Sequence, residues 1–167
     1  QYTSIPDSIF ELSLINLGYD SIHDGLVLTA NIVNVDTLFL ANSPFGGIGV
    51  ISDITGIEDF TNLTYLDCSG NHSFTNLDLS QNIHLNYLKC SGLDWGNLLI
   101  GNLTNLNVSQ NSLLSYLNCS NNRIENLNLS QNVNLSYLNC SNNYLNQIDL
   151  SQNTALTHLN CSENFIS

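Results

Sequence analysis

A stretch near the middle of the chain, LSYLNCSNNRIENLNLSQNVNL from Leu114 to Leu135, decides how the rest of the sequence is interpreted. When it is moved forward so that Leu114 falls on Leu135, it meets a copy of itself in which leucine, tyrosine, cysteine and asparagine return at the same places. Repetition at a period of about 20 to 50 residues indicates a solenoid, in which each coil buries its apolar edge only against its neighbours. The regular coils begin at Leu63, Leu85, Leu114, Leu135 and Leu156, and the coil from Leu85 to Leu113 is longer than the others.

Each copy contains short L-x-L or L-x-C segments, which indicate strands because alternate side chains of a strand point to opposite faces. In residues 116–120, YLNCS, we expect leucine and cysteine to point inward and tyrosine, asparagine and serine to point outward. Parallel strands of successive coils stack at about 4.8 Å, so identical positions form ladders along the stack. The sequence therefore predicts a mainly β solenoid with short parallel strands in one sheet.

The chain divides into a cap and an array of repeats. Residues 1–34 lack the repeat and are predicted to form an N-terminal α-helical cap, since residues 5–17 carry apolar residues at roughly helical spacing. Irregular repeats are expected over 35–62 and regular coils over 63–167, with an insertion at about residues 93–101. No C-terminal capping segment follows, so we expect further repeats or a partner to cover the open C-terminal end.

Charge and hydropathy restrict the partners and the location. The chain has 2 basic residues against 14 acidic ones, and a net charge of −12 disfavours nucleic acid and anionic membranes. No apolar run reaches the roughly 18 to 20 residues that span a bilayer, so membrane insertion is not expected. The sequence starts at Gln1 and contains no methionine, as in a mature chain whose signal peptide has been removed. We therefore expect a secreted or cell-surface protein.

Two inward types of residue have structural explanations. The cysteines recur once per coil in a single file, which holds them farther apart than the roughly 3.8 Å between Cβ atoms in a disulfide and cannot converge on a metal ion. We therefore expect buried free thiols and no bound metal. Two asparagine files lie where strands end, and the donor and acceptor atoms of their amides can both pair with backbone groups of adjacent turns. The first file is Asn71, Asn122, Asn143 and Asn164, and the second is Asn82, Asn111, Asn132 and Asn153. The file of cysteines is Cys68, Cys90, Cys119, Cys140 and Cys161.

The outward rows carry the candidate binding residues. A stripe of tyrosines flanked by amides and hydroxyls suits a protein surface or sugar rings, because tyrosine combines a rigid apolar ring with a polar tip. The alternative is that the rings stack on each other and protect the sheet. The predicted sheet-face site is Tyr65, Tyr87, Tyr116, Tyr137, His158 and Lys89. The insertion supplies a second candidate site at Asp94 and Trp95, the latter being the only tryptophan.

Signals for chemistry are weak. The chain has no nucleophile elbow, zinc-protease or phosphate-loop motif, so we expect neither enzymatic activity nor a cofactor. Ser8, Ser21 and Thr37 each follow an aspartate and precede an apolar residue, and these triplets resemble the O-glycosylation motif of Bacteroidetes. Asp20 and Asp24 beside Gly25 suggest either a Ca²⁺ loop or, as the preferred interpretation, an ordinary turn of the cap.

The repeat LxYLxCSxNxIxxLxLSQN resembles the short leucine-rich repeats of bacterial proteins, and the cysteine file resembles that of the internalin-J-like surface proteins. Residues 51–71, ISDITGIEDFTNLTYLDCSGN, are similar to the entry into internalin repeats, and residues 5–21 resemble the cap of secreted Bacteroidetes-type proteins. The resemblance implies a leucine-rich repeat solenoid and a non-enzymatic recognition or adhesion module, which binds a protein or glycan through the sheet face. The alternative is a structural spacer or cap domain of a larger secreted adhesin.

Overall fold

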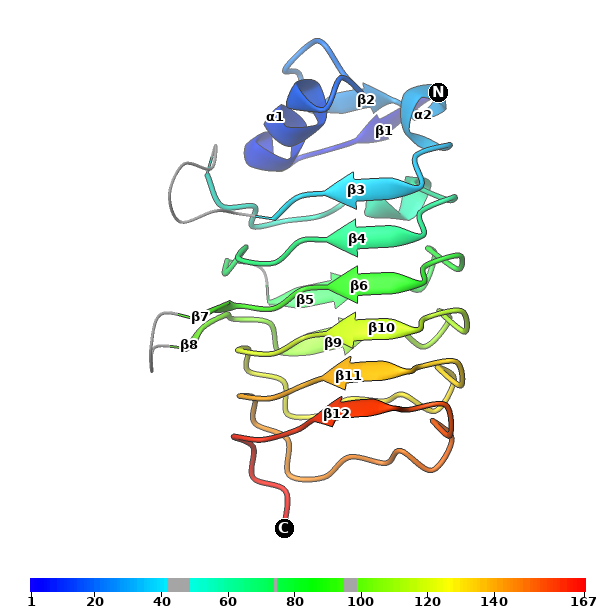
Figure 1. Cartoon of the computed structure of the whole chain (residues 1–167). Helices are drawn as coiled ribbons and strands as arrows, with labels where there is room; N and C mark the ends of the chain where they lie inside the picture. Colours follow the sequence, from blue (N-terminus) through cyan, green and yellow to red (C-terminus); the bar gives the residue numbers. More distant parts are fainter. Residues whose placement is uncertain (42–48, 74, 95–98) are drawn as a thin grey trace.

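The computed structural model describes residues 1–41, 49–73, 75–94 and 99–167, with the backbone alone at residues 94, 99 and 100. The chain forms one stack of coils beneath an N-terminal cap (Figure 1). Six parallel strands form the main sheet, in the order β12-β11-β10-β6-β4-β3. Their bounds are Thr37–Phe39 (β3), Tyr65–Asp67 (β4), Tyr87–Lys89 (β6), Tyr116–Asn118 (β10), Tyr137–Asn139 (β11) and His158–Asn160 (β12).

The register of this sheet follows the repeat. Tyr87, Tyr116 and Tyr137 are Cα partners on three neighbouring strands, and the leucines that follow them are partners in turn. Behind the main sheet lies a second parallel pair, β5 (Asn76–Asp78) and β9 (Asn105–Asn107) (Figure 1). The structure confirms the predicted leucine-rich repeat solenoid with its parallel sheet.

The core is a file of inward leucines and cysteines between the two faces. Leu117 is fully buried and Leu138 is 1% exposed, whereas Leu159 on the last strand is 50% exposed. Burying a leucine side chain stabilises the fold by about 1.5 to 3 kcal/mol, so each coil stabilises the one beside it.

The two asparagine files satisfy the turns, in different ways. In the first file, the Nδ2 atom of Asn143 donates to the carbonyls of Cys119 (3.0 Å) and Cys140 (3.1 Å), and its Oδ1 accepts from the N–H of Ile124 (3.0 Å). In the second file, the Nδ2 of Asn132 donates to the carbonyls of Val108 and Asn111 in the preceding coil, but its buried Oδ1 has no partner within the described chain. The predicted use of both amide atoms therefore holds for the first file only.

The cap contains a helix, as predicted, and an antiparallel pair of strands that was not expected from the sequence. Helix α1 spans Ser8–Asn16, strands β1 (Tyr2–Ser4) and β2 (Leu26–Leu28) pair with each other, and the short helix α2 covers Thr29–Ile32. A single 3-10 turn, η1 (Ile57–Asp59), follows in the first irregular coil.

Asp7 joins the cap to the solenoid. Its Oδ1 accepts from the N–H groups of Ile9 and Phe10 at 2.9 Å each and so caps α1. Its Oδ2 accepts from the N–H of Ser52 (2.8 Å), the hydroxyl of Ser52 (2.7 Å) and the N–H of Asp53 (3.0 Å). Burial opposes ionisation of Asp7, but these hydrogen bonds outweigh burial and hold its pKa below the usual value.

The first coil also approaches the cap closely at Gly56. This residue has a φ of 99°, and a Cβ there would lie 2.6 Å from the carbonyl oxygen of Ser4. Only glycine fits, because it has no Cβ and tolerates a left-handed backbone. The position of the cap on the solenoid is thus set by Asp7 on one segment and by Gly56 on the next.

Candidate functional site

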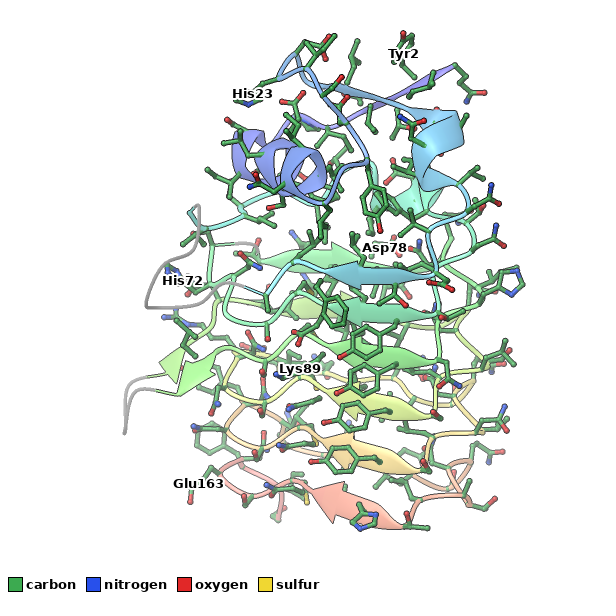
Figure 2. The ribbon with its side chains drawn as sticks, turned by 45° about the horizontal axis from the view of Figure 1, so that its top comes forward. Tyr2, His23, His72, Asp78, Lys89 and Glu163 are labelled. Atoms are coloured by element: carbon green, nitrogen blue, oxygen red, sulfur yellow. The ribbon has the colours of Figure 1, made fainter. Side chains whose placement is uncertain are left out.

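The outward face of the main sheet carries a column of stacked rings. The ring centroids of Tyr65, Tyr87, Tyr116 and Tyr137 follow one another at 4.3, 4.1 and 4.3 Å, with interplanar angles of 7° to 9°. Figure 2 shows these rings one above another over the strands, beside Lys89. The in-register sheet produces this spacing directly, because each strand places its tyrosine one strand-width from the next. The rings therefore stack on each other, which is the alternative arrangement that the sequence left open.

The column is longer than the tyrosines alone. At one end, the ring of Phe39 lies 5.0 Å from that of Tyr65 at a tilt of 50°, and 58% of Phe39 is exposed. At the other end, the ring of exposed His158 lies 6.0 Å from that of Tyr137. Phe39 is absent from the predicted site, although its position between inward Leu38 and Leu40 could have placed it on this face. We call Phe39, Tyr65, Tyr87, Tyr116, Tyr137 and His158 the aromatic column.

Stacking decides which parts of the rings meet solvent. Each inner tyrosine is half-buried, because its two faces lie against neighbours, while the ring edge and the phenol remain outward. Burial raises the pKa of Tyr87 above its usual value, and interactions with the phenols of Tyr116 and Tyr65 raise it further. Burial likewise raises the pKa of Tyr137, and interactions with the neighbouring phenol of Tyr116 raise it further. At neutral pH the phenols of Tyr87 and Tyr137 are therefore uncharged donors and acceptors.

The next outward row serves the backbone. The Oδ1 of Asn118 accepts from the N–H of Ser120 (3.1 Å) and from its hydroxyl (2.8 Å), which closes the turn at the end of β10. Asn139 and Asn160 make the same pair of bonds to the serine two residues on. The Oδ1 atoms of these amides are therefore occupied in the turns.

Lys89 lies in this second row, where it replaces an amide. Its Nζ is 3.5 Å from Oδ2 of Asp67 on the neighbouring strand. The Oδ1 of Asp67 accepts from the N–H and hydroxyl of Ser69, so the carboxylate is fixed on both sides. The pair gives the middle of the face one cation and one anion beside the aromatic column.

The insertion forms a short ribbon of two antiparallel strands, β7 (Leu93–Asp94) and β8 (Leu99–Ile100). Two glycines let it leave the coil: a Cβ at Gly92 would fall on the carbonyl oxygen of Asn121, and one at Gly101 on the side chain of Asn122. The structure describes only the backbone of the candidate residue Asp94, and Trp95 lies outside the described residues.

The predicted modification sites lie at the N-terminal end. Ser8 and Ser21 are exposed, whereas Thr37 is half-buried on β3, in register with Tyr65. The Oγ of Ser8 is 2.9 Å from Nε2 of His23, and the same nitrogen is 3.1 Å from Oε2 of Glu11. Because a catalytic triad uses the two different ring nitrogens, this arrangement is not one. Glu11 is 2% exposed and accepts from the N–H groups of Asp24 and Gly25, so it holds the turn that follows the helix.

All five cysteines are free, which confirms the predicted thiols. Cys68, Cys90, Cys119 and Cys140 are buried, and Cys161 is partly exposed at the last coil. Burial raises the pKa of Cys140 to about 12. Over the residues that the structure describes, no group of three metal-binding side chains occurs and no helix is long and apolar enough to cross a membrane.

Comparison with solved structures found similar repeat proteins. The functional domain of internalin J from Listeria monocytogenes, which includes a cysteine ladder, is 30% identical over 98% of this chain and 48% of that chain, with a TM-score of 0.45. A leucine-rich repeat protein of Leptospira interrogans is 24% identical over 65% of this chain and 33% of that chain, with a TM-score of 0.47. Internalin C2 of Listeria monocytogenes is 20% identical over 100% of this chain and 90% of that chain, with a TM-score of 0.41.

This chain thus spans about half the length of the internalin J domain that it matches. No protein-family model and no curated protein matched the sequence. The assignment of the fold rests on the repeated sequence of the coils and on the parallel register of the main sheet.

Proposed function

We propose that this leucine-rich repeat protein, whose cysteine ladder is of the internalin-J type, is a non-enzymatic recognition module that binds a protein partner through the aromatic column. One observation carries the proposal: half-exposed aromatic rings run without a break across the outward face of the six-stranded sheet. Aromatic side chains dominate the energetics of protein interfaces because they bury large area at a low cost in side-chain entropy.

Stacking favours a protein over a glycan on this face. A sugar ring binds an aromatic side chain by lying on its face, and rings 4.1 to 4.3 Å apart leave no room between them. The exposed edges and phenols suit the grooves and polar atoms of a protein surface. The stacked rings are also held in place before binding, which lowers the ordering cost of association.

The size and charge of the face indicate the kind of partner. Six strands span about 24 Å along the stack, so the column is only a narrow strip of surface. Its area is small beside the roughly 800 Å² that each partner buries in a standard interface. The aromatic column would therefore form the centre of the contact, with Asp67, Lys89 and the insertion at its rim. A net charge of −12 favours a partner with a basic rim.

Location outside the cell is part of the proposal. Four thiols are buried in the core, so they are protected from the oxidation that exposed thiols undergo in secreted proteins. O-glycosylation at exposed Ser8 and Ser21 fits the same location. Thr37 remains a third proposed modification site, although it is half-buried on β3.

A binding screen tests the function. The protein is presented to immobilised panels of extracellular proteins and of glycans, and each interaction is measured again with the double variant Tyr87→Ala/Tyr116→Ala. Tyr144→Ala is the matched control, because Tyr144 lies outside the column and is 38% exposed. We expect protein ligands whose affinity falls at least about tenfold for each column tyrosine removed, while the control keeps its affinity.

The opposite outcomes are equally clear. A protein ligand that binds the double variant as tightly as the wild type would place recognition elsewhere on the chain. If no member of either panel binds the wild type, the alternative function is favoured, that of a structural spacer in a larger adhesin whose further repeats or partner cover the last coil.

A further inference from the structure

A second, smaller aromatic site lies outside the column. Tyr144 and Phe165 occupy equivalent positions one coil apart, each directly after an asparagine of the first file. The N–H of Tyr144 donates to the carbonyl of Ile124 (2.9 Å), and that of Phe165 to the carbonyl of Leu145 (2.8 Å). The backbone that carries each ring is therefore hydrogen-bonded to the preceding coil.

The two rings differ from those of the column in how much of their faces they leave open. Their centroids are 6.1 Å apart and their planes are tilted by 41°, so neither ring covers the other. Tyr144 is 38% exposed and Phe165 is 69% exposed. The four tyrosines of the column lack such open faces, because each has a neighbouring ring on both sides, and an open face is what a sugar ring needs.

Polar side chains complete this site. Tyr144, Phe165, Glu125 and Asn146 line an open hollow of about 480 Å³. Within the described part of the chain, no hydrogen bond occupies the side chains of Glu125 and Asn146, so both have free polar atoms at the wall. A carboxylate and an amide beside an aromatic ring can hydrogen-bond the hydroxyls of a sugar that lies on the ring.

A second hollow continues the first along the same coils. It measures about 460 Å³ and is lined by Asn126, Leu127, Asn128, Gln147, Ile148 and Asp149. The two hollows adjoin because Glu125 and Asn126 are consecutive residues, as are Asn146 and Gln147. Partly buried Ile148 gives the second hollow an apolar floor between amide walls.

The charge near this site excludes the anionic ligand classes. Glu125 and Asp149 bring two carboxylates, and the hydrogen bond from the N–H of Ser151 lowers the pKa of Asp149, which keeps it charged. Arg123 is the only cation in these coils, and it stands one coil before Tyr144 in the same row. Against a net charge of −12, one arginine does not make a site for sulfated or uronic-acid polymers.

We propose that the surface formed by Tyr144, Phe165, Glu125 and Asn146, continued by Asn126 and Gln147, binds an uncharged polysaccharide chain. Sugar rings lie on the open aromatic faces, and their hydroxyls bond to the amides and carboxylates of the two hollows. The site is separate from the aromatic column, so the protein carries one surface for a protein partner and another for a glycan.

Affinity gel electrophoresis of the whole chain tests this proposal. Native gels contain one of three uncharged polymers, hydroxyethylcellulose, laminarin or amylopectin, or the anionic polymer carboxymethylcellulose. We expect at least one uncharged polymer to retard the wild type and carboxymethylcellulose to retard it less than hydroxyethylcellulose does. Tyr144→Ala and Phe165→Ala should each weaken the affinity for the retarding polymer, calculated from the retardation, at least about tenfold. Loss of a central aromatic contact has an effect of this size.

Two controls separate this site from the column and from misfolding. Tyr87→Ala, in the column, should leave the retardation unchanged, and Glu125→Ala and Asn146→Ala should weaken it without altering the circular dichroism spectrum. Absence of retardation in all three uncharged polymers, or equal loss with Tyr87→Ala, overturns the proposal. Because Tyr144→Ala is expected to keep the protein partner, failure of this site and failure of the aromatic column are distinguishable.

Discussion

Replacing Asp7 by asparagine changes one carboxylate oxygen to an amide nitrogen at a position where the carboxylate accepts five hydrogen bonds. The remaining oxygen can still cap helix α1. The new amide nitrogen faces the N–H groups of Ser52 and Asp53, and neither can accept a hydrogen bond from it. An unpaired N–H costs about 1 to 3 kcal/mol, and because Ser52 and Asp53 are exposed, water lowers that cost. We expect Asp7→Asn to lower the free energy of unfolding by about 2 to 3 kcal/mol.

The stability difference that this substitution causes should also depend on pH. The pKa of Asp7 in the folded protein lies below its unfolded value of about 3.9, so its stabilisation is complete above that pH. It is lost as the pH falls through the lowered folded pKa, because the wild-type carboxyl then becomes neutral as well. The difference in the free energy of unfolding between wild type and Asp7→Asn should therefore become smaller once the pH falls below about 4.

Urea unfolding, followed by circular dichroism at neutral pH and along a series of acidic buffers, measures both effects. Asp149→Asn is the matched control, since it removes the same charge from an exposed carboxylate, and it should change the free energy of unfolding by less than about 0.5 kcal/mol. A variant Asp7→Asn as stable as this control would refute the assigned link between cap and solenoid. So would a stability difference that stays constant at acidic pH.

Three further predictions follow from the ladders. Asn132→Ala should destabilise the fold by about 2 to 4 kcal/mol in urea, because a buried amide that holds two carbonyls is lost, while exposed Gln131→Ala should cost less than about 0.5 kcal/mol. With a thiol reagent, Cys161 should react first and the other four cysteines, such as Cys140 whose pKa burial raises to about 12, only on unfolding; five equal rates would contradict the buried file. The folded pKa of Tyr87 is raised, so its stabilisation is complete below the unfolded pKa of about 10 and is lost as the pH rises beyond it. Tyr87→Phe, which keeps the ring but cannot ionise, should therefore resist alkaline unfolding better than the wild type, as circular dichroism would show.

The repeat made the periodic part of this structure predictable. Once Leu117, Cys119 and Asn122 recur in the next coil at Leu138, Cys140 and Asn143, stacking fixes which side chains lie inside and which form rows outside. The stacking of the tyrosine rings was open in the sequence, because outward rows at strand spacing can either pack together or remain apart. The register of the sheet decided in favour of stacking.

The parts that occur once were harder to predict. Strands β1 and β2 are three residues each, too short to show an alternating pattern, and they pair with each other although helix α1 lies between them in the sequence. The bonds that Ser52 donates to Asp7 join residues 45 apart in sequence, and no local signal marks them. Tyr144 and Phe165 were visible as aromatic residues in equivalent positions, but only their open faces and the hollow beside them identify a site.

Site-specific photo-crosslinking tests the central claim, that the aromatic column is the surface for a protein partner. A benzophenone amino acid replaces Tyr116 in one version of the protein and Tyr144 in another, and each is irradiated with the panel of extracellular proteins. We expect a covalent adduct with a protein from position 116 alone, suppressed by excess wild type but not by the Tyr87→Ala/Tyr116→Ala variant. No adduct from position 116, or one that the double variant suppresses as well as the wild type does, would contradict it.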